Sequence, residues 1–168
     1  MRILIAFSSL SGNTRDVARQ VRARCEALGH EVSWIEAGIQ ALTDAGEPRH
    51  DLYVLGAWTD NAGRTPSEMK ALIAELVAAV GKPAQLAVFG TGETQWGEEY
   101  YCGAVRRIAA FFGTRYPRLE IEQMPHGERD ALRIQRWTDR ILTCTQRMPG
   151  PGMPSETIEN ADPARFVA

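Results

Sequence analysis

The sequence predicts an α/β fold in which a parallel sheet lies between two layers of helices. Three observations predict it. Short, nearly continuous apolar runs are typical of strands buried on both faces, segments with helical periodicity follow these runs, and polar loops separate the two. Five such strands alternate with helices. The right-handed crossover rule then gives a doubly wound, three-layer sandwich.

The N-terminal half supplies three strands and two helices. Residues 2–7 form the first buried strand, and after Asn13 apolar residues recur at helical spacing up to Gly29, which suits a left-handed cap. These apolar residues are Val17, Val21, Cys25 and Leu28. Residues 31–36 alternate like a strand near an edge, and residues 51–57 form a third strand. A helix over 66–80 follows, with Pro66 suited to its first turn.

The C-terminal half continues the alternation. Residues 85–90 repeat the buried-strand pattern, and a helix then runs through Val105, Ile108, Ala109 and Phe112. A strand over 117–122 and a helix over about 127–145 complete the domain, which we place at residues 1–147. Residues 148–168 are rich in Pro, Gly and acidic side chains and lack core periodicity, so we expect a tail there.

Composition narrows the class of protein. The chain has 168 residues and a net charge of -2. Hydrophobic residues make up 44% of it, which is enough to form one core. Because Lys and Arg form no stripe, we expect no nucleic-acid partner. The start resembles no signal peptide and no apolar run approaches the roughly 20 residues of a membrane span, so we expect a soluble, cytoplasmic protein. Cys25, Cys102 and Cys144 lack paired spacing and are expected to be buried free thiols.

The fold indicates where a ligand would bind. In an open parallel sheet, ligands lie beyond the carboxyl ends of the strands, near the point where strand order reverses. Three loops therefore matter, after the first, third and fourth strands. They are Ser8–Thr14, Trp58–Thr65 and Gly90–Glu99.

The first of these loops is rich in hydroxyl groups at the start of a helix. Free backbone N–H groups and the helix dipole favour an anion there, and the hydroxyls add donors without charge. The lysine-containing phosphate loop GxxxxGK[ST] is absent, which disfavours a nucleoside triphosphate. A Ser/Thr-rich helix cap without a ligand explains the same residues, so both interpretations stay open.

The segment IAFSSLSGNTRDVARQV resembles the flavodoxin signature, with matching residues at Phe7, Ser9, Gly12, Thr14, Ala18 and Val21, whereas Ala6 departs from it. The resemblance implies noncovalent FMN, with its phosphate held by the hydroxyls and backbone of this loop. The residues so implied are Ser8, Ser9, Leu10, Ser11, Gly12, Asn13 and Thr14.

The loop GTGETQWGEEYYCGA resembles the flavodoxin loop that follows the fourth strand. The family pattern has two glycines, an acidic residue, an aromatic ring and then an aromatic residue before Cys. The residues in these places are Gly90, Thr91, Gly92, Glu93, Trp96, Tyr101 and Cys102. We expect Trp96 to stack on the flavin, while the alternative is that it only covers the loop. Tyr101 is expected rather to pack the following helix.

The loop GAWTDNAGRTPSEM is similar to the third flavodoxin loop, which carries Thr, often an aromatic residue, and then Gly. The flavin contacts implied here are Ala57, Trp58, Thr59, Asp60, Asn61 and Gly63. Asp60 occupies the usual aromatic place, so either Trp58 covers the second flavin face, or that face is open or met by Asn61. After Gly, Asn is the residue that best tolerates positive φ, and we expect the family's redox-linked peptide flip to survive at Asn61.

The resemblance implies the strand order 2-1-3-4-5 and a low-potential electron carrier. Its partners would be a flavodoxin reductase and an acceptor protein, and we expect a monomer that turns over no substrate of its own. Two alternatives use the same fold. The pair Trp96–Gly97 is similar to flavodoxins that activate the metallocofactor of ribonucleotide reductase, and a flavin-dependent NAD(P)H or quinone reductase is the other. His30, His50 and His126 are scattered, so no metal site is expected.

Overall fold

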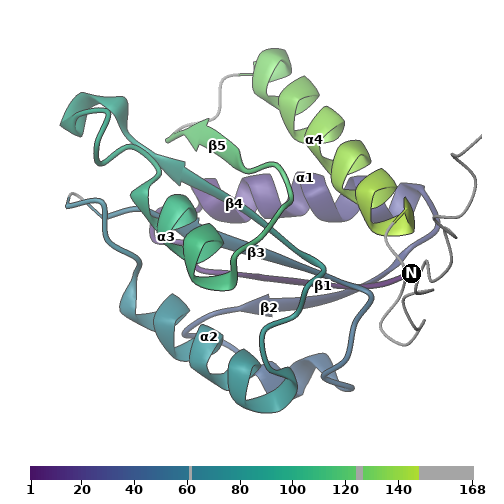
Figure 1. Cartoon of the computed structure of the whole chain (residues 1–168). Helices are drawn as coiled ribbons and strands as arrows, with labels where there is room; N and C mark the ends of the chain where they lie inside the picture. Colours follow the sequence, from purple (N-terminus) through teal and green to yellow (C-terminus); the bar gives the residue numbers. More distant parts are fainter. Residues whose placement is uncertain (61, 124–126, 148–168) are drawn as a thin grey trace, which may run out of the picture.

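The computed structural model describes residues 1–60, 62–123 and 127–147. The chain alternates strands and helices from end to end (Figure 1). The strands are β1 (Arg2–Phe7), β2 (Glu31–Glu36), β3 (Leu52–Trp58), β4 (Leu86–Gly92) and β5 (Leu119–Glu122). The helices are α1 (Asn13–Ala27), α2 (Ser67–Val80), α3 (Gly103–Phe112) and α4 (Gly127–Arg147), and two short 3-10 turns, η1 (Leu42–Ala45) and η2 (Thr94–Trp96), interrupt the loops.

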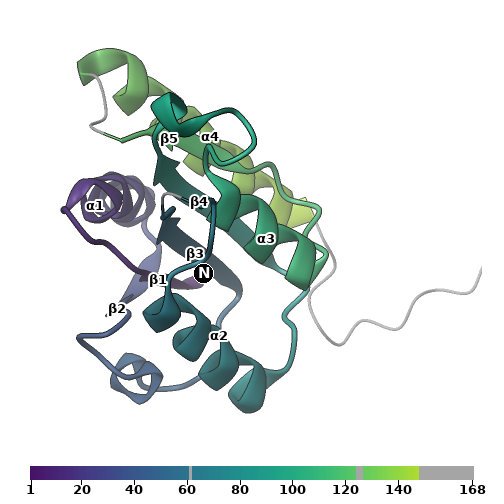
Figure 2. The ribbon, with the colours of Figure 1, turned by 90° about the vertical axis from the view of Figure 1, so that its left-hand side faces the viewer.

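The five strands form one parallel sheet in the order β2-β1-β3-β4-β5. Helices α1 and α4 cover one face and α2 and α3 the other, which gives three layers (Figure 2). This confirms the predicted sandwich and strand order. It also confirms that residues 31–36 form an edge strand, because β1 is the only described strand with which β2 pairs.

Strand β1 shows why an unbroken apolar run is required in the middle of this sheet. Ile3, Ile5 and Phe7 point into the core beneath α1 and α4, whereas Leu4 and Ala6 point into the core beneath α2 and α3. Successive side chains of a strand face opposite sides, so a strand covered by helices on both faces needs apolar residues at every position. The carboxyl end of β1 is thereby fixed at the centre of the molecule.

Several predicted details need correction. Pro66 precedes α2 as its N-cap rather than lying inside it, and Leu28 is 45% exposed just after α1 instead of packing with Val17 and Val21. Cys25 and Cys102 are buried as expected, but Cys144 is only partly buried. Gly29 has φ of 79°, which confirms the left-handed cap. The expected tail, residues 148–168, lies outside the described residues, as do His126 and Asn61.

Candidate functional site

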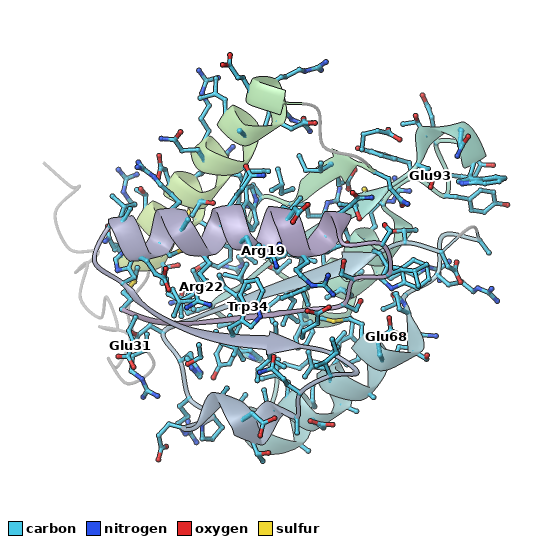
Figure 3. The ribbon with its side chains drawn as sticks, turned by 180° about the vertical axis from the view of Figure 1, so that it is seen from behind. Arg19, Arg22, Glu31, Trp34, Glu68 and Glu93 are labelled. Atoms are coloured by element: carbon cyan, nitrogen blue, oxygen red, sulfur yellow. The ribbon has the colours of Figure 1, made fainter. Side chains whose placement is uncertain are left out.

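Three loops meet where β1, β3 and β4 end. These strands are neighbours in the sheet and run parallel, so the loops that follow them leave from the same edge. Figure 3 shows Glu68, at the start of α2, and Glu93, after β4, at that end of the molecule, and Glu31, at the start of β2, at the other. The three loops that the sequence singled out are therefore together in space.

The loop after β1 is folded around one hydroxyl group. Ser9 Oγ accepts hydrogen bonds from the backbone N–H groups of Gly12 and Arg15, each at 3.2 Å. Gly12 has φ of 97°, a conformation that a residue with Cβ adopts only with strain, so the turn requires glycine. The result is a tight bend that leads directly into the first turn of α1.

This bend leaves several donors unused. Within the described residues, the backbone N–H groups of Leu10, Ser11, Asn13 and Thr14 have no acceptor, and the Asn13 amide donates to Ser11 Oγ at 3.0 Å. Free N–H groups at a helix start bind anions, because they carry the positive end of the helix dipole. The residues of this loop therefore fit a phosphate group held by neutral donors.

Three buried hydroxyl groups, those of Ser8, Thr14 and Thr91, lie at the base of the same loop. Thr14 Oγ1 and Thr91 Oγ1 are 2.8 Å apart and hydrogen-bonded, which connects α1 to β4. If Thr91 donates, the Thr14 hydrogen is left for a ligand. Ser8 Oγ is fully buried and has no partner among the residues described, while its N–H donates to the Gly56 oxygen at 3.0 Å. An unsatisfied buried hydroxyl is rare in folded proteins and suits a site that receives an acceptor.

The loop after β3 is organised by Asp60. Its carboxylate accepts hydrogen bonds from the N–H groups of Ala62 and Arg64 and from Arg64 Nε, at 2.8 to 3.0 Å. Burial alone would raise the pKa of Asp60, but these hydrogen bonds outweigh it and hold the pKa below its usual value. The Asp60 carboxylate therefore holds this loop closed. It occupies the position where the flavodoxin pattern often has an aromatic residue.

Trp58 is directed by a hydrogen bond to the helix that follows it. Its Nε1 donates to Glu68 Oε1 at 2.9 Å, and its side chain is half-buried. The indole is thus tied to the first turn of α2. Thr59 Oγ1 accepts the N–H of Ala104 at 3.3 Å, so the same loop is also joined to α3.

Arg107 and Gly103 also connect the loop after β3 to α3, and neither was predicted from the sequence as a site residue. Arg107 Nε donates to the Gly63 oxygen at 3.0 Å, and a Cβ at Gly103 would lie 2.4 Å from that same oxygen. The loop and α3 therefore touch backbone to backbone, which only glycine at 103 permits. The sequence signal for this close approach is a glycine directly after Cys102, at the start of a helix.

Trp96 lies on the outer side of the loop after β4. It is 49% exposed, and its Nε1 donates to Glu93 Oε2 at 2.8 Å. Gln95 donates to the same oxygen of Glu93. The hydrogen bond fixes the edge of the indole and leaves a large part of the ring accessible, as a stacking partner must be.

Gly90 and Gly92, at the end of β4, have a packing role. A Cβ at Gly90 would lie 2.2 Å from the Ala57 oxygen, and one at Gly92 would lie 2.5 Å from the Cys102 nitrogen. Their side-chain positions are thus filled by the protein itself. The small residues let β3, β4 and the start of α3 approach each other, which brings the loops together.

Cys102 and Tyr101 lie beneath this loop. The Cys102 thiol is buried and points at the backbone oxygens of Gly90 and Ile121, at 3.8 and 3.7 Å, and its backbone has φ of 47°. Burial raises the pKa of Cys102 to about 12, so the thiol stays protonated at neutral pH. Tyr101 is half-buried, and burial raises its pKa as well. Neither residue is prepared for acid, base or nucleophilic chemistry.

The two buried thiols predict a loss of stability in alkali. Burial raises the pKa of Cys25 and of Cys102 to about 12, from about 9 when the thiol is free. A raised pKa stabilises the folded state below pH 9, and this contribution is lost as pH rises from 9 toward 12, because only the unfolded chain ionises. We expect the unfolding free energy to fall by about 1 kcal/mol per thiol between pH 9 and 10. Urea unfolding at both pH values measures it.

The control for this prediction is a variant with both thiols replaced by alanine. That variant is less stable throughout, but its unfolding free energy should change little between pH 9 and 10. An equal slope in both proteins would show that other groups control the alkaline transition.

Neither a metal site nor a membrane-spanning helix is present among the described residues. No three or more His, Cys, Asp or Glu side chains gather as metal ligands in the part of the chain that the structure describes. Over the same residues, no helix is both long enough and apolar enough to cross a bilayer.

Comparison with known proteins agrees with this geometry. Residues 5–132 match the sequence profile of a family described as Flavodoxin. The chain is 29% identical to the probable flavodoxin 2 of Bacillus subtilis over 138 residues, which are 77% of this chain and 87% of that protein. It is also 29% identical to the flavodoxin of Nitratidesulfovibrio vulgaris over 148 residues, 84% and 97% of the two chains. The crystal structure of oxidised flavodoxin 2 from Bacillus cereus superposes with a TM-score of 0.70 at 27% identity, covering 86% of this chain and 99% of that one.

Proposed function

Because the chain belongs to the flavodoxin family of flavin-binding electron carriers, we propose that it holds FMN without covalent attachment and passes electrons at low potential between protein partners. The partners are a reductase that supplies electrons and a protein that accepts them. FMN supplies the reducible ring, and the protein supplies a binding site and the electrostatic environment of that ring.

The observation that carries the proposal is the group of free donors after β1. Four backbone N–H groups without an acceptor in the described part of the chain lie at the start of α1, at Leu10, Ser11, Asn13 and Thr14. Ser9 shapes the turn, and Ser11 and Thr14 add hydroxyl groups. A phosphate monoester fits this set of donors.

The loop after β4 is suited to the ring. Trp96 offers an accessible indole face whose edge is fixed by Glu93, and the carboxylate of Glu93 places negative charge beside it. Negative charge near the ring makes the reduced, anionic flavin less favourable and lowers the potential. Burial raises the pKa of the Cys102 thiol to about 12, so this cysteine supplies no thiolate to the electron transfer at neutral pH.

The test begins with the absorption spectrum of freshly purified protein. We expect a flavin band close to one per chain, released by acid and identified as FMN, and a single-chain mass in size-exclusion chromatography. The protein alone should oxidise almost no NADPH, because a carrier needs its reductase. Rapid NADPH oxidation would favour a reductase, and a colourless protein that does not bind added FMN would overturn the proposal.

Replacing Trp96 with Ala is expected to weaken FMN binding about tenfold, because a stacked aromatic pair contributes roughly 0.5–1.5 kcal/mol beyond its buried area. Titration of the apoprotein with FMN, followed by quenching of flavin fluorescence, measures the dissociation constant. Trp96→Phe keeps a ring and should recover most of the affinity.

Phe111 provides the matched control for Trp96. It is 47% exposed, close to the 49% of Trp96, but lies on α3 beneath the Lys82 ammonium. Phe111→Ala should leave FMN affinity unchanged. If Trp96→Ala behaves in the same way, Trp96 is not the stacking ring.

A further inference from the structure

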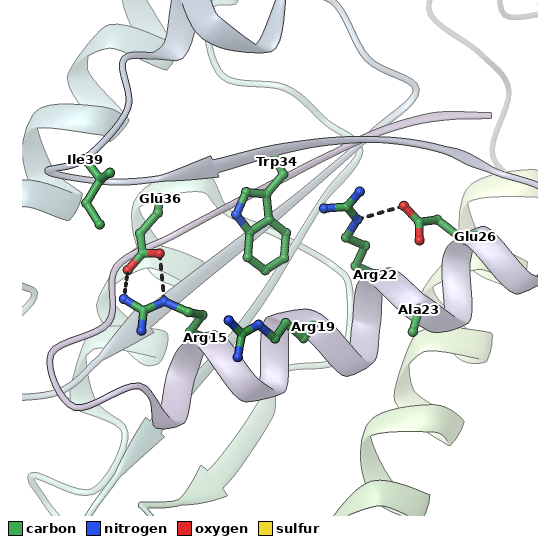
Figure 4. A pocket seen from close by; sticks show the side chains of 8 residues that line it. All are labelled: Arg15, Arg19, Arg22, Ala23, Glu26, Trp34, Glu36 and Ile39. Atoms are coloured by element: carbon green, nitrogen blue, oxygen red, sulfur yellow. Dashed lines mark hydrogen bonds and ion pairs between the residues drawn. The ribbon is translucent and has the colours of Figure 1, made fainter.

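Arg15, in the first turn of α1 next to the loop after β1, forms an ion pair with Glu36 of the edge strand β2. Its Nε and Nη2 donate to the two carboxylate oxygens of Glu36 at 2.8 and 2.5 Å (Figure 4). The Glu36 side chain is 10% exposed and that of Arg15 is 32% exposed. Two parallel hydrogen bonds to a carboxylate hold a guanidinium in one orientation.

Both partners are attached to the loop that receives the phosphate. The Arg15 N–H donates to Ser9 Oγ, which shapes the loop, and Glu36 pairs in the sheet with Phe7, the last residue of β1. The third guanidinium nitrogen, Nη1, has no hydrogen-bond partner in the described ranges. It lies 3.8 Å from the position that a Cβ on Gly12 would take. One unused cationic donor is therefore beside the loop.

The neighbouring arginines differ from Arg15. Arg15, Arg19 and Arg22 line one groove together with Trp34 (Figure 4). The volume of this groove is about 570 Å³. Arg19 pairs with Asp16 and Arg22 with Glu26, both on α1 itself, in the ordinary manner of an exposed helix. Of these three arginines, only Arg15 pairs with a carboxylate from another element, and that carboxylate is almost buried.

The charge balance at the loop follows from this pair. The donors of the loop itself are neutral, and the Arg15–Glu36 pair places one positive and one negative charge beside them. Asp16, in the same first turn of α1, is paired with Arg19. A phosphate dianion is repelled by Glu36 and attracted by Arg15, and the attraction acts through a half-buried site where Coulomb interactions are stronger than in water. Riboflavin carries no phosphate and experiences neither effect.

We propose that Arg15 is a specificity-determining residue that makes this site prefer FMN over riboflavin, by offsetting the Glu36 carboxylate and directing a cationic donor to the phosphate. The inference rests on the proposed function, since it concerns the same cofactor. The alternative is that the ion pair only connects α1 to β2 and does not act on the phosphate. Removal of either partner would then lower the affinity for both flavins.

The experiment uses four variants of the full chain, Arg15→Gln, Glu36→Gln, the double variant and Arg19→Gln. Apoprotein is titrated with FMN and with riboflavin, and its thermal midpoint is measured with and without inorganic phosphate. Arg15→Gln should weaken FMN binding on the order of tenfold, as expected for one charge near a dianion, and leave riboflavin within about twofold. The thermal midpoint of Arg15→Gln should rise less with phosphate than that of the wild type.

Glu36→Gln should act in the opposite direction, because it frees the guanidinium. We expect FMN to bind a few fold more tightly than to the wild type, and the double variant to lie between the two single ones. The Arg15→Gln loss should shrink in high salt, since screening weakens the repulsion by Glu36. Arg19→Gln, one turn further along the same groove, should match the wild type.

Several results would overturn the inference while leaving the proposed function intact. One is an unchanged ratio of FMN to riboflavin affinity in Arg15→Gln, and another is a loss of FMN affinity in Glu36→Gln equal to that in Arg15→Gln. By contrast, a wild-type protein that binds neither flavin would overturn the proposed function itself.

Discussion

Replacing Gly90 with alanine is expected to destabilise the protein by about 3 kcal/mol and to remove most of its FMN binding. The added Cβ would lie 2.2 Å from the Ala57 oxygen and 2.6 Å from Val105 Cγ2. Because Ala57 and Gly90 are paired in adjacent strands, the backbone cannot move away without separating β3 from β4. Overpacking of this kind costs roughly 1–3 kcal/mol, and a clash with backbone lies at the upper end. Urea unfolding of the apoprotein measures the loss.

The control for Gly90 is a glycine with open space around it. Gly29 has φ of 79° and no atom within 4 Å of its Cβ position, so Gly29→Ala introduces backbone strain alone. We expect it to cost about 1 kcal/mol and to leave FMN affinity unchanged. A Gly90→Ala protein as stable as the wild type would show that the two strands tolerate a wider spacing.

The sheet could be predicted from the sequence because a strand that is buried on both faces requires an unbroken run of apolar residues. In β1, every residue from Ile3 to Phe7 is apolar and fully or almost fully buried, so the run reads as one strand. The alternation of β2 likewise identified an edge. The position of the loops then followed from topology alone, since parallel strands end at one edge.

The contacts that shape the site could not be predicted in the same way. Arg15 and Glu36 are 21 residues apart, and their pairing depends on how far α1 is rotated over the sheet. The approach of Gly103 to Gly63 depends equally on the path of two loops. The sequence shows which residues lie on a loop. The direction of each side chain depends on how the helices and strands pack, which the sequence does not show directly.

Replacing Thr14 with valine is expected to weaken FMN binding by about 10- to 100-fold, while riboflavin binding changes little. Valine has nearly the shape of threonine, so the change removes one hydroxyl group at a buried site. A hydrogen bond to a charged group contributes roughly 1.5–3 kcal/mol, which corresponds to that loss of affinity. The variant also leaves the Thr91 hydroxyl without its 2.8 Å partner, so a modest fall in stability accompanies it.

Thr138 separates the loss of a buried hydroxyl from the loss of a phosphate donor. It is fully buried on α4, and its Oγ1 donates to the Ile134 oxygen at 2.8 Å, within its own helix. Thr138→Val should lower stability slightly without affecting either flavin, and Thr14→Ser, which keeps the hydroxyl, should recover most of the FMN affinity. Equal losses of FMN and riboflavin affinity in Thr14→Val would mean that the phosphate binds elsewhere, because only a contact with the phosphate can distinguish the two ligands.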